Sequence, residues 1–330
     1  MEYRQLGNSE FRVSAIAFGA WAIGGWMWGG ADEHDALEAI DTAIDLGMTS
    51  IDTAPIYGMG HSERLVGRAI SGKRDKVQVL TKYGLRWDES RGEFYFDSVD
   101  NSGSAVKIYR LGARDSVLKE CEDSLKRLGI DYIDLYQMHW TDSTTPVEET
   151  MEAVERLIEQ GKVRYSGVCN YPVDLLQKAH LRLSQISNQV PYSMVLRRIE
   201  KDLVPWCLEY GVGILAYSPL QRGLLTGKIS EDHRFNPGDH RPDTPYFRPG
   251  NISKTNEFLE KIRPIADGHG ATLAQLVLNW TIRQPGITSA LAGARNSKQV
   301  KDNAGALGFV LSTEEIDEIN RLLGELKLDL

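Results

Sequence analysis

The sequence predicts an α/β fold in which short buried strands alternate with amphipathic helices, and three observations carry this prediction. Eight apolar segments of strand length recur along the 330 residues, and stretches with helical periodicity separate them, as repeated β-α units require. Three of these segments change abruptly from apolar to polar residues, as strands do where their C-terminal ends line one rim of a closed parallel barrel. The length also suits one α/β barrel with insertions. We therefore expect a (β/α)8 TIM barrel, with residues 1–330 forming a single domain.

The expected elements fill the chain without a linker that would divide it. Two short segments, residues 3–6 and 11–14, flank the polar stretch 7–10 and predict a β-hairpin that plugs the bottom of the barrel. The last helical segments, at about 254–268 and 313–326, are expected to pack outside the barrel. The eight barrel strands are expected at about 15–20, 49–53, 77–82, 132–138, 163–168, 185–189, 213–217 and 288–293.

Helix starts are indicated by capping boxes, in which a Ser or Thr is followed three residues later by Glu or Gln. The pattern occurs at Thr272 and at Ser312. It occurs again at Thr145, where Pro146 would occupy the first helical position. We expect a helix to begin after each of these three residues.

Composition and charge exclude several classes of function. The net charge of −8 argues against a nucleic acid or an anionic membrane as partner. No run of 18 apolar residues could span a membrane, and no secretory signal is visible, so we expect a cytoplasmic protein. Cys121, Cys169 and Cys207 lack C-x-x-C spacing, which predicts reduced thiols, and the histidines lack metal-ligand spacing, so no metal is expected.

Four polar residues stand at or just beyond the C-terminal ends of three expected strands: Asp52, Tyr57, Lys82 and His139. Because adjacent strands lie about 4.8 Å apart, these side chains could converge. A phenol, with a pKa of about 10, is a poor acid at neutral pH, but a neighbouring ammonium lowers that pKa. Lys82 would supply the ammonium and Asp52 would keep it charged. Tyr57 would then donate a proton to a carbonyl oxygen as a hydride arrives at the carbon, with His139 orienting that oxygen.

Taken singly, each of these residues also has a structural interpretation. Asp52 and Lys82 could form a buried ion pair, His139 could be a core histidine, and Tyr57 could be an ordinary loop aromatic. Four independent placements at strand ends favour the catalytic interpretation.

The four residues lie in the runs Asp52-Thr53-Ala54-x-x-Tyr57-Gly58, Thr81-Lys82 and Gln137-Met138-His139. These runs resemble the active-site segments of the aldo-keto reductase superfamily, and the likeness continues through residues 166–171, 188–193, 216–220 and 293–296. The chain is most similar to the bacterial branch related to general-stress reductases and potassium-channel β subunits. The resemblance implies a (β/α)8 barrel that reduces an aldehyde, a ketone or a sugar-like carbonyl compound with NADP(H), using Asp52, Tyr57, Lys82 and His139 as the catalytic tetrad.

The resemblance also implies which residues bind the cofactor. Tyr217 would be the platform for the nicotinamide ring, with Asn170 and Gln189 at its carboxamide. Cys169 stands there too, where the family commonly has Ser, and a thiol is a weaker hydrogen-bond partner. The remaining expected contacts are Gly19, Trp21 and Asp52 near the nicotinamide, Ser218, Leu220, Arg222, Gly223 and Lys228 around the pyrophosphate, and Gly293, Arg295, Gln299 and Asn303 at the adenosine end.

We expect NADP(H) rather than NAD(H), because Arg295 and Lys298 lie at the start of a helix where a 2′-phosphate could bind. The family more often has Lys and Arg where this chain has Gly293 and Gln299, so strict selectivity is not predicted. A solvated helix start is the alternative interpretation of these charges.

Aromatic residues and two long connections complete the expected site. We interpret residues 83–112 as a wall of the substrate pocket and residues 218–252 as a clasp over the cofactor, because loops of this length are usually functional. Any single tryptophan could instead pack in the barrel core. The residues expected around the substrate carbonyl are Trp21, Trp26, Trp28, Tyr57, Trp87, His139 and Trp140.

Two other functions fit some of these features. One is a redox sensor or channel-associated subunit that binds the cofactor with little turnover, although an intact tetrad favours the enzyme. The other is an aldolase-like lyase with Lys82 as a Schiff-base lysine. Such a lysine must be neutral, and Asp52 would keep it charged.

Overall fold

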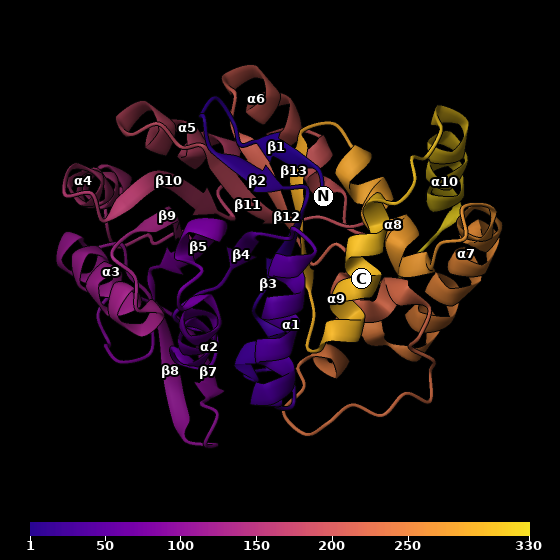
Figure 1. Ribbon diagram of the computed structural model, residues 1–330, viewed down its shortest axis with the longest axis horizontal. Helices are drawn as coiled ribbons and strands as arrows, with labels where there is room; N and C mark the ends of the chain where they lie inside the picture. Colours follow the sequence, from indigo (N-terminus) through magenta and orange to yellow (C-terminus); the bar gives the residue numbers. More distant parts are fainter.

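The apolar segments form a closed barrel of eight parallel strands in the computed structural model, which describes residues 1–330 (Figure 1). This confirms the predicted TIM barrel, and every expected strand is present to within two residues at its ends. In order around the barrel the strands are β3 (Ile16–Gly19), β4 (Ser50–Asp52), β5 (Gln78–Tyr83), β9 (Ile133–Met138), β10 (Val163–Cys169), β11 (Ser187–Pro191), β12 (Gly213–Tyr217) and β13 (Ile287–Gly293).

Ten α-helices surround the barrel, and each barrel strand leads to one of them. Two helices are additional: α7 (Pro249–Gly268) is inserted between β12 and its barrel helix, and α10 (Thr313–Glu325) packs on α7, outside the barrel as predicted (Figure 1). The barrel helices are α1 (Glu33–Asp45), α2 (His61–Ile70), α3 (Arg114–Leu128), α4 (Val147–Glu159), α5 (Val173–Arg182), α6 (Leu203–Tyr210), α8 (Leu273–Arg283) and α9 (Ser297–Ala304).

The N-terminal hairpin closes one end of the barrel, as predicted. Its strands β1 (Tyr3–Gln5) and β2 (Arg12–Ser14) are antiparallel. Leu6 in the turn is fully buried and belongs to the same apolar cluster as Leu80, Leu135 and Leu215, which point into the barrel. Burial of these leucines drives barrel closure, because each fully buried side chain contributes about 1.5–3 kcal/mol. The opposite, C-terminal rim is left open for polar groups.

Strand register brings the polar ends of neighbouring strands together on that rim. Asp52 at the end of β4 pairs with Leu80 on β5, two residues before Lys82. Lys82 in turn pairs with Gln137 on β9, two residues before His139. The spacing in sequence therefore becomes proximity in space.

Two of the three predicted capping boxes are present. The side chains of Thr272 and Ser312 each accept a hydrogen bond from the backbone N–H three residues later, and their own backbone N–H groups donate to the side chains of Gln275 and Glu315 in return. The prediction at Thr145 is wrong, because Pro146 is the residue that precedes α4 and no side chain caps this helix. Pro146, with a ψ of 133°, is not helical and occupies the N-cap position, and its side chain has no hydrogen-bond acceptor. Thr145 therefore lies one residue before the N-cap position that its side chain was expected to fill.

The two long connections contain more structure than loops. Residues 83–112 include an antiparallel sheet of β6 (Leu85–Arg86), β8 (Ala105–Arg110) and β7 (Glu93–Val99), in that spatial order. Residues 218–252 contain three short 3₁₀ helices and the start of α7. Both follow C-terminal strand ends, so both lie at the open rim.

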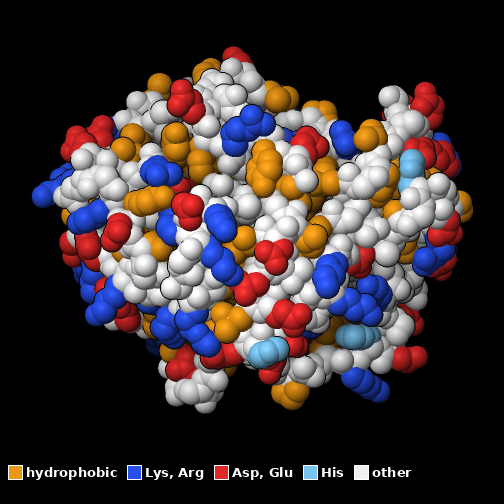
Figure 2. Space-filling view, in the orientation of Figure 1, with side chains coloured by type: hydrophobic (Ala, Val, Ile, Leu, Met, Phe, Trp, Pro, Cys, Tyr) orange, Lys and Arg blue, Asp and Glu red, His pale blue; other side chains and the backbone are white.

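Acidic and basic side chains are intermixed over the face seen in Figure 2, without a continuous basic area. This agrees with the net charge of −8. No helix is both long and apolar enough to cross a membrane.

The close packing of α2 against α3 leaves no room for a side chain at Gly67. A methyl group there would lie 2.5 Å from the carbonyl oxygen of Leu128. We expect Gly67→Ala to lower the free energy of unfolding by about 1–3 kcal/mol in urea denaturation, although alanine favours helices. Gly324→Ala is the control, because no atom lies within 4 Å of its added methyl group. It should raise the free energy of unfolding by about 0.5–1 kcal/mol. Equal effects of both substitutions would contradict the close packing.

Candidate active site

A buried ion pair forms the floor of the open rim. Lys82 Nζ donates a hydrogen bond of 2.7 Å to Asp52 Oδ2 and another of 2.8 Å to the carbonyl oxygen of Thr53. Gln189 Nε2 donates to the other Asp52 oxygen at 2.8 Å. Burial is the largest single influence and lowers the pKa of Lys82, but the charge and hydrogen bond of Asp52, together with smaller contributions from Tyr57 and Cys169, raise that pKa above its usual value. Lys82 is therefore a fixed cation at physiological pH, which is incompatible with the Schiff-base alternative.

Tyr57 lies directly above this cation. Its ring centroid is 4.9 Å from Lys82 Nζ. The turn that carries it is closed by its own backbone, because Tyr57 N–H donates to Ala54 O at 3.2 Å and Ser62 N–H donates to Tyr57 O at 3.1 Å. Ser62 Oγ also donates to Ala20 O at 2.8 Å, which anchors the turn to the end of β3. The tyrosine therefore has a defined position relative to the barrel.

Burial raises the pKa of Tyr57 to about 12, and the Lys82 charge opposes that rise. The sequence predicted a pKa lowered by Lys82. Lys82 acts in the predicted direction, but loss of solvent around the phenol is the larger effect. Tyr57 is consequently protonated at neutral pH and able to donate, while the cation beneath it stabilises the phenolate left after donation.

His139 faces Tyr57 across the rim. The two rings are perpendicular, with centroids 5.8 Å apart. Burial, and then the Lys82 charge, hold the pKa of His139 well below its ordinary value. The imidazole is therefore neutral and can orient an oxygen through one N–H, but it does not serve as a cationic acid.

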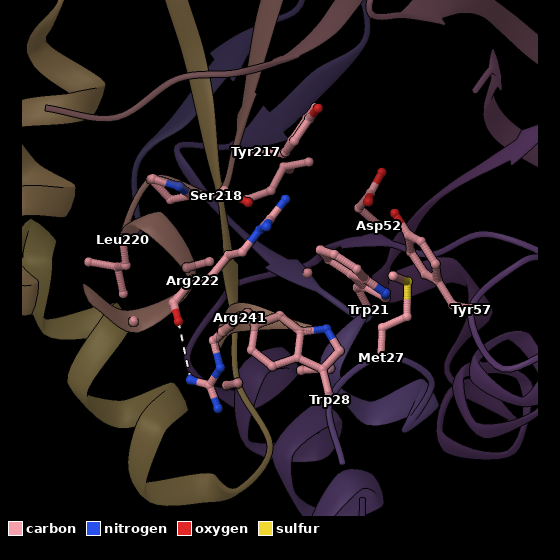
Figure 3. Close-up of a pocket in the computed structure, with 18 of the residues that line it drawn as sticks. Trp21, Met27, Trp28, Asp52, Tyr57, Tyr217, Ser218, Leu220, Arg222 and Arg241 are labelled. Carbon is pink, nitrogen blue, oxygen red and sulfur yellow. Dashed lines mark hydrogen bonds between the residues drawn. The ribbon is translucent and has the colours of Figure 1, made fainter. Parts of the chain in front are cut away.

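One cavity of about 540 Å³ extends from this rim over β12 and β13 (Figure 3). Lys82 lies beneath the cavity surface, and the other three tetrad residues line it. Lys298, which the sequence also indicated for the 2′-phosphate, is exposed and does not line the cavity. The other residues that the sequence indicated for the cofactor do line it: Gly19, Trp21, Asp52, Cys169, Asn170, Gln189, Tyr217, Ser218, Leu220, Arg222, Gly223, Lys228, Gly293, Arg295, Gln299 and Asn303.

Tyr217 is held at the middle of this cavity by a hydrogen-bonded chain. Its hydroxyl donates to Asn170 Oδ1 at 3.0 Å, and Asn170 Nδ2 donates to the carbonyl oxygen of His139 at 3.1 Å. Burial raises the pKa of the neighbouring Cys169 thiol, so this residue stays uncharged. The ring of Tyr217 is therefore fixed as a flat surface beside the tetrad.

Two arginines of the cavity lack a carboxylate partner. Burial lowers the pKa of Arg222, and burial together with repulsion from Arg241 lowers that of Arg295. Arg241 itself is paired with Asp239 at 2.6 Å and donates to the Arg222 carbonyl oxygen at 3.3 Å (Figure 3). Half-buried guanidinium groups without an acid suit a polyanionic ligand, because an anion would relieve the cost of their burial.

Some side chains that were expected to contact the cofactor form hydrogen bonds within the protein instead. Gln299 Oε1 accepts a hydrogen bond from the backbone N–H of Arg295 at 2.8 Å, and Asn303 Nδ2 donates to Gly293 O at 3.3 Å. These two side chains shape the loop that carries Arg295. Lys228 lies 3.4 Å from Asp302, a cavity residue that the sequence did not indicate.

The tetrad end of the cavity is aromatic, as predicted, with one correction. Trp21, Trp26, Trp28 and Trp140 line it. Trp87 does not, because β6 ends at Arg86 and the chain then bends away, leaving Trp87 packed on the outside of the aromatic cluster.

Sequence reasoning missed two further aromatic walls, Tyr95 and Phe96. Their signal was the run Phe94-Tyr95-Phe96, whose strong strand propensity marked a strand inside the expected loop. Met27, another lining residue, has a positive φ of 63°, and no local pattern in the sequence predicts this conformation.

Comparison with known proteins agrees with this geometry. The model of the aldo/keto reductase family matches residues 15–323. The chain belongs to the aldo-keto reductase family. It is accordingly an oxidoreductase, and its barrel is the one that the resemblance implied.

Relatives within the family cover nearly the whole chain. Aldo-keto reductase YhdN of Bacillus subtilis (strain 168) is 36% identical over 326 residues, which are 98% of this chain and 94% of the relative. The NADH-specific methylglyoxal reductase of Escherichia coli (strain K12) is 35% identical, over 93% of this chain and 94% of that protein.

Solved structures of the family show the same fold. The glycerol dehydrogenase AKR11B4 from Gluconobacter oxydans has a TM-score of 0.87 at 34% identity, with 98% of this chain and 95% of that chain covered. An aldo/keto reductase from Klebsiella pneumoniae in complex with NADP and acetate has a TM-score of 0.74 at 30% identity, with 98% and 96% covered.

The lowered pKa of His139 predicts how stability depends on pH. Below its ordinary pKa of 6.5 the unfolded chain binds a proton at this residue and the folded protein does not, so stability falls as pH falls. The slope is up to about 1.4 kcal/mol per pH unit. Urea unfolding at pH 7 and at pH 5 measures this effect. Between these two pH values, the free energy of unfolding should fall by about 2 kcal/mol less in His139→Gln than in the wild type. Equal losses would show that His139 titrates normally.

Proposed function

We propose that this aldo-keto reductase reduces aldehydes or ketones to alcohols with NADPH, with Tyr57 as the proton donor. The observation that carries this proposal is a permanently charged Lys82 ammonium beneath a protonated Tyr57 at the floor of an aromatic cavity. A carbonyl oxygen placed between Tyr57 and His139 would accept one hydrogen bond from each. As charge develops on that oxygen, the Tyr57 proton moves to it and Lys82 stabilises the remaining phenolate.

The residues present fit a phosphorylated dinucleotide. Such a cofactor supplies the hydride. Tyr217 would hold its nicotinamide ring, and the unpaired Arg222 would bind its pyrophosphate. Arg295, which lacks an acidic partner and lies in the loop between β13 and α9, would bind the adenosine 2′-phosphate. This assignment favours NADPH, as in the Klebsiella complex with NADP, over the cofactor of the NADH-specific relative.

Replacement of Tyr57 by Phe tests the proton donor. Because only the phenolic hydroxyl is lost, kcat for carbonyl reduction should fall about 100- to 10,000-fold, while NADPH should still quench protein fluorescence with an unchanged Kd. Tyr83→Phe is the matched control, since Tyr83 is buried next to Lys82 on β5 and its hydroxyl has no partner. Activity of Tyr57→Phe within a few-fold of wild type would refute the mechanism. Tight cofactor binding without turnover in the wild type would favour the sensor.

Replacement of Arg295 by Ala tests the choice of cofactor. Loss of a charged partner of the 2′-phosphate should lower kcat/KM for NADPH about tenfold or more and leave kcat/KM for NADH nearly unchanged. Lys298→Ala is the control, because Lys298 is exposed and does not line the cavity. An equal loss with both cofactors would assign Arg295 a structural role instead.

A further inference from the structure

The hairpin of β7 and β8 projects beyond α2 and α3 in Figure 1, and one side of it forms part of the cavity wall. Tyr95 and Phe96 on β7 line the aromatic end of the cavity. β7 is an edge strand that pairs only with β8, so the hairpin receives little support from the barrel. Its position over the tetrad must therefore depend on contacts with other rim loops.

The far end of the hairpin is attached to the loop that follows β3. Trp26 Nε1 donates a hydrogen bond of 3.1 Å to Ser98 Oγ. The rings of Trp26 and Phe96 are stacked nearly parallel, at 18°, with centroids 6.3 Å apart. Asn101, in the turn between the strands, donates through Nδ2 to the carbonyl oxygen of Gly24 at 2.9 Å. Two side-chain hydrogen bonds thus cross from the hairpin to this loop.

The near end is attached to the loop that follows β9. The Glu93 carboxylate accepts from Ser143 N at 3.1 Å and from Ser143 Oγ at 2.8 Å. Arg110 lies 3.2 Å from Glu93, and its guanidinium stacks 3.8 Å above the ring of Tyr95. Tyr95 in turn packs on Trp140, with centroids 5.4 Å apart. The hairpin therefore spans the cavity mouth between the loops after β3 and β9.

The contact of Asn101 with Gly24 is packed directly against the catalytic turn. A methyl group on Gly24 would lie 2.9 Å from Tyr57 O. A methyl group on Gly58 would lie 2.4 Å from Gly24 O and 2.7 Å from Asn101 Nδ2. The Tyr57 turn is closed by its own hydrogen bonds, so the position of Tyr57 does not depend on the bond from Asn101 to Gly24. That bond instead fixes the position of the hairpin relative to Tyr57.

We propose that Ser98 and Asn101 are positioning residues that set the width of the substrate cavity. By holding Phe96 and Tyr95 at a fixed distance from Tyr57, they select carbonyl compounds that carry a flat aromatic ring, which packs against these side chains where they line the cavity. A small aliphatic carbonyl compound does not reach this wall, so its KM and kcat do not depend on where the wall lies. This inference rests on the proposed reductase function.

Steady-state kinetics with 2-naphthaldehyde and propanal test the proposal. Ser98→Ala and Asn101→Ala should each raise KM for 2-naphthaldehyde about fivefold, the effect of one lost hydrogen bond, with kcat within twofold of wild type. Both constants for propanal should stay within twofold. Asn101→Asp keeps the size of the side chain but cannot donate, so it should match Asn101→Ala. Ser104→Ala is the control, because Ser104 lies in the same turn and contacts neither Gly24 nor Trp26.

Cleavage by trypsin at Lys107, an exposed residue of β8, tests the attachment without any catalysis. The double variant Ser98→Ala/Asn101→Ala should be cut there about tenfold faster than the wild type and Ser104→Ala, because release of the hairpin exposes its backbone. Unchanged cleavage overturns the attachment. Faster cleavage with an unchanged KM for 2-naphthaldehyde would show that Ser98 and Asn101 hold the hairpin but do not select the substrate. A wild type that reduces neither aldehyde contradicts the reductase function, and cleavage still decides whether the hairpin is attached.

Discussion

The buried pair of Asp52 and Lys82 is the interaction on which the site depends. Two charges removed from water cost several kcal/mol each, and only close pairing with further hydrogen bonds offsets that cost. The barrel meets this condition by ending β4 and β5 side by side, and Thr53 and Gln189 provide the additional bonds. A cation fixed in this way lies beneath Tyr57. The proposed proton donation by Tyr57 depends on that constraint.

The loops, rather than the barrel, give the cavity its shape and carry its backbone strain. Six residues other than glycine have positive φ, and four of them, Met27, Asn170, Ser218 and Arg222, line the cavity. Such conformations cost about 1–3 kcal/mol each and persist only where the surroundings enforce them. Here the bond from Tyr217 to Asn170 and that from Arg241 to the Arg222 carbonyl supply the support. The barrel strands thus position Asp52 and Lys82, and strained loops form much of the cavity wall.

Particular residues show where sequence reasoning succeeded and where it failed. Asp52, Lys82 and His139 were predictable because each interrupts an apolar strand at its end, a signal within a few residues of sequence. Trp87 was wrongly placed in the pocket and Tyr95 was missed, because the direction of a side chain in residues 83–112 depends on how β6, β7 and β8 pair. The failed cap at Thr145 has a local cause, since the extended Pro146 displaced the helix start by one residue.

By itself the sequence determined the barrel, its N-terminal hairpin and the set of residues that meet at the C-terminal rim. Hydrophobic periodicity and strand ends are local properties, and parallel strands of a closed barrel leave few ways to arrange them. Only the tertiary structure decided that burial outweighs Lys82 in the pKa of Tyr57, that Arg295 lacks an acid partner, and that Asn101 reaches Gly24. These properties arise from solvent exclusion and from contacts between residues far apart in the chain, which local patterns do not encode.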